Sequence, residues 1–437
     1  MRRLRRVLFV AVMLGVGWWA SRTAMAQEAG VPDTVSGIYG NTPEMLRPFS
    51  GGISRPYRQF FITPLEYPGP GRDKPEPDVD TVKIGVLAPL ERTHERYIGQ
   101  PILKGCQLAV EEANAEGGYK GKPFGVVVHN DSGLWGASAN EIAKFSYEDS
   151  AWAVIGSVDG ANTHIAIRVA LKTEIPIMNV GDTDPTLVET SIPWVFRNIA
   201  DDRQMCYTLA HYLFEDRNFQ RTAILRANNR YGRFGVAEFR QACIRLQHPA
   251  PIEVNYDMRW AEMDTTFRMQ VERLKRANPD AIVLWADAQP GGYLVRAIRA
   301  AGIRAPIFAC DRVIHPDFVR IAGEAAEGVV AASPYDPSRD DPVLKAFQRH
   351  YREQFGEEPD VYAAHAYDGA KMIIRAIREA GLNRYRIRDS LAAMRRYHGV
   401  TGDILFDSVF ADRGPTSVAS LINGRWVFGV PRVSQAY

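Results

Sequence analysis

From Thr81 onward, short apolar segments alternate with segments of helical periodicity, and this alternation constrains the fold more than any other feature of the sequence. The first apolar segment covers 82–87, and a helical stripe that includes Leu103, Cys106 and Ala113 follows it and ends at a Gly-Gly pair. Strands that alternate with helices predict βαβ units and therefore parallel sheets. Further strands are predicted at 124–128, 152–155, 175–178, 222–225, 252–255, 281–285, 306–309 and 328–331, and a further helix at 267–276.

The order of elements changes after Pro334. Long helices are predicted at 342–355 and 361–380, and short strands follow at 403–406, 417–421 and 426–428. A mature length of about 410 residues exceeds one typical hydrophobic core, so two domains are expected. The sequence therefore predicts an α/β protein with parallel sheets in two domains.

Two polar loops are placed to form one site. Loops 156–163 and 179–185 each follow directly on an apolar strand. Ligands of open α/β sheets bind in the crevice outside the carboxyl ends of the strands, so both loops are expected to face one binding site. Asn162 or Thr163 is predicted to cap the intervening helix, whose first N–H groups would favour a carboxylate or another electron-rich group.

The first 26 residues have the pattern of a secretory signal peptide. Four arginines precede the apolar run 7–20, and Ala24-Met25-Ala26 gives the small-x-small pattern that signal peptidase cleaves. A membrane anchor is the alternative, but the run is shorter than the roughly 20 residues needed to span a bilayer, and no cysteine follows to carry a lipid. We predict a periplasmic protein, exported through a cleaved signal peptide at 1–26, with no stable membrane insertion.

Charge and cysteine usage narrow the function classes. The leader contains five arginines and no acidic residue, so the formal net charge changes from +2 to −3 on its removal, which argues against a nucleic-acid partner. The four cysteines lack metal-ligand spacing, and no cofactor motif is present, so neither a metal nor a cofactor is predicted. Buried free thiols are the favoured interpretation, with a Cys206–Cys243 disulfide as the alternative.

Residues 27–80 differ in composition from the rest of the chain. Prolines interrupt this segment repeatedly, with Tyr57, Phe60, Phe61 and Tyr67 between them. The prolines exclude long helices and central strands, whereas free linkers are poor in aromatic residues. We therefore expect an extended arm whose rings pack on the globular body.

An ordered series of segments resembles a known family. It includes VKIGVLAPL, LKGCQLAVEEANAEGG, IPIMNVGDTDPTL, WVFRNIADDRQ, NNRYGRFG and IAGEAAEGVV, spread over about 82–430. The series is similar to type I periplasmic solute-binding proteins of ABC transporters, in the leucine/isoleucine/valine- and amide-binding branch. The resemblance implies two doubly wound parallel-sheet lobes joined by three crossovers, with the ligand cleft between the lobes.

The resemblance also implies where the lobes begin and end. The N-terminal lobe is expected to comprise 81–200 and 335–413, and the C-terminal lobe 201–334 and 414–437. The crossovers are expected near 200–203, 333–336 and 412–417.

Specific site residues follow from the resemblance. Tyr97 corresponds to an aromatic residue against the ligand side chain, and Tyr231 to an aromatic residue from the far lobe. Gly181 and Thr183 correspond to positions that hold the ligand's amino and carboxylate ends, and Asp311 to the acid that pairs with its ammonium group. The complete expected ligand-binding set is Tyr97, Gly160, Ala161, Asn162, Gly181, Asp182, Thr183, Tyr231 and Asp311.

Two departures from the family pattern concern the ligand. Gly160 stands where amino-acid binders of the family have a serine that binds the ligand carboxylate. Ala364 stands where some have a bulky ring, so the alanine would widen the pocket. Acidic residues also follow several strands, which suits a cationic or polyhydroxylated ligand. The alternative is that these aspartates are caps and turn formers, an interpretation favoured for Asp184 and Asp287.

Three functions from different classes are compatible with this pattern. The favoured one is an exported binding protein that delivers a small polar solute to an ABC permease complex in the inner membrane; a sensory receptor domain and an enzyme are the alternatives. Asp159, His164 and Arg168 could be drawn as an acid-base group, but no hydrolase, metalloprotease or phosphate-binding motif accompanies them. No enzymatic activity is predicted.

Overall fold

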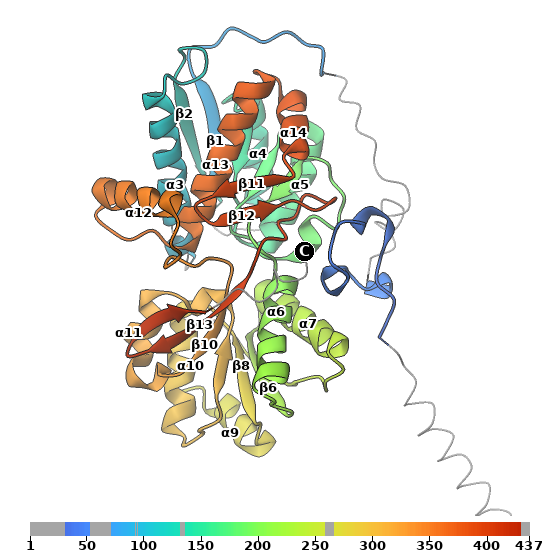
Figure 1. Cartoon of the computed structure of the whole chain (residues 1–437), viewed down its shortest axis with the longest axis vertical. Helices are drawn as coiled ribbons and strands as arrows, with labels where there is room; N and C mark the ends of the chain where they lie inside the picture. The colour runs from blue at the N-terminus through green and yellow to red at the C-terminus, as the bar shows by residue number, and fades with distance from the viewer. Residues whose placement is uncertain are drawn as a thin grey trace, which may run out of the picture.

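The computed structural model describes residues 31–52, 71–91, 93, 95–131, 136–257 and 266–429. These residues form two α/β lobes, one above the other in Figure 1, each built around its own sheet. The doubly wound, two-lobed fold class with three crossovers is therefore confirmed. The predicted signal peptide and the four aromatic rings of the arm named above lie outside the described residues.

The first lobe contains a five-stranded parallel sheet in the order β2-β1-β3-β4-β5. Alternate residues of β1 face opposite layers, because Val86 packs with α3 and α13 while Leu87 packs with α4 and α5. The strands are β1 (Val82–Ala88), β2 (Phe124–Asn130), β3 (Ala153–Ile155), β4 (Ile177–Asn179) and β5 (Val195–Arg197). The helices are α3 (Arg96–Ala115), α4 (Ala137–Tyr147), α5 (Gly160–Thr173), α12 (Pro342–Phe355), α13 (Val361–Ala380) and α14 (Arg384–Ala393).

The second lobe contains a seven-stranded sheet in the order β14-β13-β10-β9-β8-β6-β7. In this sheet β13 pairs in antiparallel fashion with both of its neighbours, β10 and β14. Cys206 and Cys243 lie in its core, and all four cysteines of the described residues are buried free thiols, as predicted. The strands are β6 (Thr222–Ala227), β7 (Ile252–Tyr256), β8 (Ala281–Trp285), β9 (Ile307–Ala309), β10 (Val330–Ser333), β13 (Ser417–Ile422) and β14 (Arg425–Phe428). The helices are α6 (Asp202–His211), α7 (Arg230–Arg245), α9 (Arg268–Ala277), α10 (Ala288–Ala300) and α11 (Pro316–Ala322). No helix of the described residues combines the length and the apolar character needed to cross a membrane.

Three passages of the chain connect the two sheets. They follow β5, β10 and β12 (Gly402–Leu405), and the crossover positions expected from the sequence overlap them. β12 pairs with β11 (Arg396–Gly399) in a separate hairpin.

Buried ion pairs join the first and third passages. Nη2 of Arg197 lies 2.6 Å from Oδ2 of Asp201, and Nη1 of Arg413 lies 2.7 Å from the same oxygen. Nε of Arg413 also donates to Oδ2 of Asp407 at 2.8 Å. These side chains are almost completely buried, so the passages are held by charges that neutralise one another.

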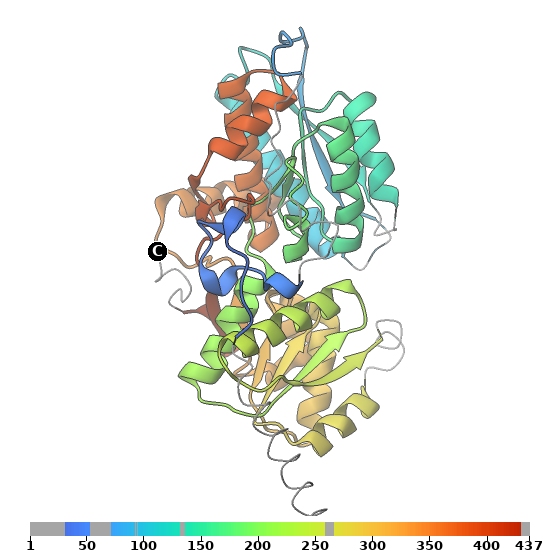
Figure 2. The same cartoon turned by 90° about the vertical axis from the view of Figure 1, so that its right-hand side faces the viewer.

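Residues 31–52, which we call the strap, contact both lobes beside these passages. The strap contains the 3-10 turns η1 (Gly37–Tyr39), η2 (Glu44–Leu46) and η3 (Ser50–Gly52), and it is the blue segment between the lobes in Figure 2. The hydroxyl of Thr42 donates to Oδ2 of Asp407 at 2.7 Å. On the second lobe, the guanidinium of Arg245 lies 4.0 Å from the ring centroid of Phe49.

Candidate functional site

The loop after β3 builds one part of the first wall of the cleft. The Asp159 carboxylate accepts hydrogen bonds from the N–H groups of Ala161 (3.0 Å) and Asn162 (3.1 Å) at the start of α5. The prediction that Asn162 or Thr163 caps this helix is wrong, because Asp159 occupies the cap. Thr163 donates instead to the Asp159 carbonyl oxygen at 2.8 Å. The N-terminus of α5 thus holds a carboxylate of the protein itself.

The loop after β4 turns through a series of side-chain caps. Oδ1 of Asn179 accepts from the N–H of Asp182 at 3.1 Å, and Oδ1 of Asp182 accepts from the N–H of Asp184 at 3.0 Å. Oδ1 of Asp184 in turn accepts from the N–H and the hydroxyl of Thr186, at 2.9 and 2.6 Å. The favoured interpretation of Asp184 as a turn-forming residue is confirmed, and both aspartates also line the cleft.

The second wall comes from the start of α7 and the loop after β9. Asn229 caps α7 by accepting from the N–H of Gly232 at 2.8 Å, which places Tyr231 in the first turn. The hydroxyl of Tyr231 donates to Oδ1 of Asp311 at 3.0 Å, and the guanidinium of Arg312 lies 3.8 Å from the centroid of the same ring. Asp311 and Arg312 are both buried.

Arg230 extends from the second lobe to the first beside Gly160. Its Nη2 lies 2.7 Å from Oδ2 of Asp184, and its Nε donates to that oxygen at 2.9 Å. A Cβ atom on Gly160 would lie 2.9 Å from Nε of Arg230 and 3.0 Å from Oδ2 of Asp184. The absence of a side chain at Gly160 therefore gives this ion pair its room. The cavity that remains is about 10 Å³, roughly the space of one water molecule.

A second group of contacts between the lobes surrounds Asp287. Its Oδ1 accepts from Nη1 of Arg312 at 2.9 Å and from the hydroxyl of Tyr97 at 3.3 Å. Arg312 also lies 3.6 Å from Oε1 of Glu95. Although Asp287 occupies the N-cap position of α10, its side chain makes no capping hydrogen bond. The favoured interpretation of Asp287 as a cap is therefore wrong, and its carboxylate links the two lobes instead.

The predicted site residues occupy three kinds of position. Gly160, Asp182 and Tyr231 line the cavity directly. Asp311 lies one hydrogen bond behind it, through Tyr231, whereas Tyr97 bonds to Asp287, which contacts the lining residue Arg312. Of the others, Ala161 and Asn162 form the capped start of α5, and Gly181 and Thr183 belong to the loop after β4; a Cβ on Gly181 would lie 3.3 Å from Ile102 and Val158.

Sequence reasoning missed several residues of the cleft and misplaced one. Ala364, expected to widen the pocket, is completely buried in the hydrophobic core of the first lobe. Arg230 and Arg312 are direct neighbours in sequence of the predicted residues Tyr231 and Asp311. This adjacency could have identified them as site residues. The missed residues include Glu95, Asp202, Arg230, Phe234 and Arg312.

Burial changes the ionisation of these acids in different directions. It raises the pKa of Asp182, and repulsion from Asp184 adds to the shift. It also raises the pKa of Asp202 and of Asp311. For Asp184, contacts with His164 and Arg230 outweigh burial and lower the pKa. The charge of Asp184 is therefore compensated within the protein, whereas ionisation of the other three aspartates is opposed.

Glu95 is expected to make the stability of the protein fall as the pH rises. Burial raises its pKa to about 8 from an ordinary value of 4.5; Arg312 opposes the shift, and nearby carboxylates, including those of Asp287 and Asp159, add to it. The folded state therefore binds a proton that the unfolded state has lost between these two pH values, and stability declines across that window.

Glu95→Gln should remove this contribution and make the protein more stable than the wild type at pH 8, by about 2 kcal/mol or more. Urea unfolding between pH 5 and 8.5 measures the effect. Glu379→Gln is the control, because this side chain is 49% exposed and should leave the pH dependence unchanged. Parallel curves for wild type and Glu95→Gln would show that Glu95 is ionised throughout.

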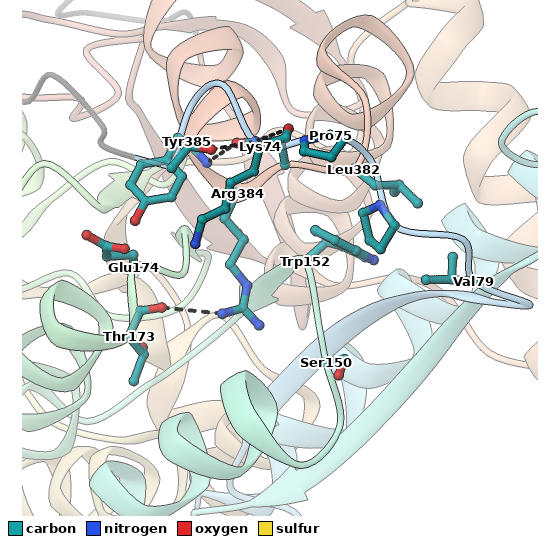
Figure 3. Close-up of a pocket in the computed structure, with 13 residues that line it drawn as sticks. Lys74, Pro75, Val79, Ser150, Trp152, Thr173, Glu174, Leu382, Arg384 and Tyr385 are labelled. Atoms are coloured by element: carbon teal, nitrogen blue, oxygen red, sulfur yellow. Dashed lines mark hydrogen bonds between the residues drawn. The ribbon is translucent and has the colours of Figure 1, made fainter.

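A larger hollow lies at the opposite end of β3. Its volume is about 490 Å³, and Figure 3 shows Trp152, Pro75 and Arg384 among the side chains around it. Arg384 donates to the carbonyl oxygens of Ala151 (3.0 Å) and Thr173 (3.3 Å), so its guanidinium is hydrogen-bonded to the backbone. This hollow lies between residues 71–79 and the first lobe. It is at the amino ends of the strands, whereas ligands of open α/β sheets bind at the carboxyl ends.

The sequence matches known proteins over most of its length. The family model described as periplasmic binding protein matches residues 81–417. A Leu/Ile/Val-binding protein homolog 2 of Brucella abortus is 25% identical over 79% of this chain and 90% of its own length. A leucine-, isoleucine-, valine-, threonine- and alanine-binding protein of Pseudomonas aeruginosa is 23% identical over 75% of this chain and 86% of its own length.

Solved structures agree with these matches. A branched-chain amino acid transporter substrate-binding protein of Streptococcus pneumoniae, in complex with isoleucine, covers 80% of this chain and 100% of its own at a TM-score of 0.73 and 26% identity. A solute-binding protein of Rhodopseudomonas palustris in complex with benzoate has a TM-score of 0.72 over 80% of this chain and 96% of its own, but at 16% identity it supports the fold alone. The resemblance stated from the sequence is confirmed.

Proposed function

Because the chain belongs to the periplasmic binding protein family, we propose that it is the exported solute-binding component of an ABC importer and captures a small polar solute between its lobes. The observation that carries the proposal is the position of the cleft. The loops that follow β3 and β4 meet those that follow β6, β8 and β9, so the carboxyl ends of both sheets face one site.

Contacts across this site support a cleft that closes. Arg230 with Asp184, and Tyr97 with Asp287, join side chains of opposite lobes by polar contacts. Polar contacts of this kind can be exchanged for contacts with a solute at modest cost. The nine residues that the family resemblance implies are proposed to contact the solute. The proposed lobes are 81–200 with 335–413 and 201–334 with 414–437.

The proposed partner is the permease complex of the importer in the inner membrane. The similar protein of Streptococcus pneumoniae is the substrate-binding protein of a branched-chain amino acid transporter. In this role the protein carries its solute without changing it, and no catalytic step is proposed.

A thermal-shift and calorimetry screen tests the proposal. The panel comprises amino acids, amides, diamines and polyamines, aromatic acids and sugars. A true solute at one hundred times its dissociation constant is expected to stabilise the folded protein by about 2.7 kcal/mol. The solute should also be recovered chemically unchanged. Conversion of a bound compound by the purified protein would contradict the transport function.

A further inference from the structure

Hydrogen-bond acceptors and donors are unequally satisfied at the cleft. Oδ2 of Asp182, Oδ1 of Asp202 and Oδ2 of Asp311 are buried and have no donor within the described part of the chain. The residues are only 3%, 1% and 3% exposed. The hydroxyl of Thr183 lies beside Asp202 but makes no hydrogen bond of normal geometry. Three buried acceptor oxygens therefore have no donor.

The groups that could receive a carboxylate are already engaged. The first N–H groups of α5 bind the Asp159 carboxylate. Arg230, the cation beside Gly160, binds Asp184 and also lies 3.3 Å from the hydroxyl of Thr186. The unsatisfied donors of the first wall include the hydroxyl of Thr183 and Nδ2 of Asn162, and both are neutral. Within the described residues, a ligand carboxylate would face acidic side chains, and the guanidinium groups of the site are already paired.

Carboxyl groups outnumber guanidinium groups among the described residues of the site. Among these described residues, the guanidinium groups are those of Arg230 and Arg312, and each is paired with a carboxylate across or along the cleft. Its carboxyl groups are more numerous: Glu95, Asp159, Asp182, Asp184, Asp202, Asp287 and Asp311. Once ionised, carboxyl groups in excess of guanidinium groups attract cations in a site shielded from solvent.

Resting on the proposed function, we propose that the solute is a small organic cation that carries ammonium groups and no carboxylate. Each ammonium group offers three donors, which matches buried oxygens that lack them. Asp182 and Asp202 line the cavity itself, and Asp311 lies behind Tyr231. A cation bound there would also replace protons on acids whose ionisation burial opposes.

Isothermal titration of the full mature protein tests the solute class. The probes are 1,3-diaminopropane, 1,4-diaminobutane, spermidine, L-leucine, benzoate and calcium chloride. At least one amine is expected to bind 100-fold or more tightly than L-leucine or benzoate. Tighter binding of L-leucine or benzoate would overturn this inference and leave the proposed function intact. Binding of calcium alone, or of no amine, would also overturn it, whereas chemical conversion of an amine would overturn the proposed function instead.

Variants that remove a single charge test whether the carboxylates of Asp202 and Asp311 bind the amine. Asp202→Asn and Asp311→Asn preserve side-chain shape, and each is expected to weaken amine binding at least tenfold. Asp280→Asn is the matched control, because Asp280 is 38% exposed, pairs with Arg221 and precedes β8 at its amino end. Its affinity should stay within twofold of the wild type. Circular dichroism verifies the fold of each variant, and unchanged affinity in a folded Asp311→Asn or Asp202→Asn protein would contradict the inference.

Discussion

Asp201→Asn is expected to lower the free energy of unfolding by about 3–5 kcal/mol. Its carboxylate lies between the guanidinium groups of Arg197 and Arg413, at 2.6 and 2.7 Å, with no exposed surface on the Asp201 side chain. Although burial opposes ionisation, these arginines hold the pKa of Asp201 below its usual range. Asparagine keeps the shape but removes the charge, so Arg197 loses its charged partner inside the protein.

Guanidinium-induced unfolding, followed by circular dichroism, measures this loss. Asp340→Asn is the control, because Asp340 pairs with Lys345 at the surface and the two side chains are 92% and 60% exposed. An exposed pair contributes about 1 kcal/mol at most. A loss below about 1 kcal/mol in Asp201→Asn would show that Asp407 alone compensates Arg413 and that Arg197 needs no carboxylate.

Gly105→Ala is expected to destabilise the protein by about 3 kcal/mol, although alanine is the better helix former. Gly105 lies on α3 where this helix meets α13, and an added Cβ would lie 2.2 Å from the carbonyl oxygen of Ala363. That atom belongs to the backbone of another buried helix, so relief requires α3 and α13 to separate. Overpacking of this kind costs 1–3 kcal/mol or more and exceeds the gain of roughly 1 kcal/mol in helix propensity.

Gly291→Ala provides a matched comparison within α10. Its nearest neighbour would be a methyl group of Val313 at 3.2 Å, which is a side-chain atom that can move by a few tenths of an ångström. The two variants should therefore differ by about 2 kcal/mol or more in urea unfolding. Equal stability would mean that α3 and α13 separate easily.

The order of strands and helices could be predicted because the sequence indicates which strands are buried and where helices begin and end. Strands such as β8 are buried along their whole length and appear as short continuous apolar runs. The predicted limits of α12 and α13 match the structure at both ends. Asp341 and Asp360 cap their starts, and Gly356 takes the left-handed conformation after α12 (φ 72°).

Elements with little burial could not be predicted in the same way. β11 has only one buried residue, Gly399, so its sequence lacks an apolar pattern. Its hairpin depends on a tertiary contact, since the N–H of Val400 donates to Oδ1 of Asp368 on α13 at 2.9 Å. Helix α14 was missed for a related reason: only Ile387 and Leu391 are buried within it.

In the candidate site, the positions of the loops could be predicted from the sequence, but the ion pairs between them could not. The loops and the unusual glycine were visible in the sequence, because strand ends and family positions locate them. The partner of Asp184 was not, since Arg230 lies 46 positions away and its place in the cleft depends on how the lobes face each other. Spacing cannot predict a contact of that kind.

The strap, residues 31–52, contacts segments that are distant from it in the sequence, and this affects the expected order of folding. Thr42 and Asp407 are separated by 365 positions, and Leu46 and Arg203 by 157, where the carbonyl oxygen of Leu46 accepts from Nη1 of Arg203 at 3.3 Å. Contacts between such distant positions form only after the intervening chain has been ordered, because closing the loop costs entropy that local contacts do not. The first described residues of the chain are therefore expected to dock last, after both lobes and their third passage exist. The strap is thus expected to complete the fold although it precedes both lobes in the sequence.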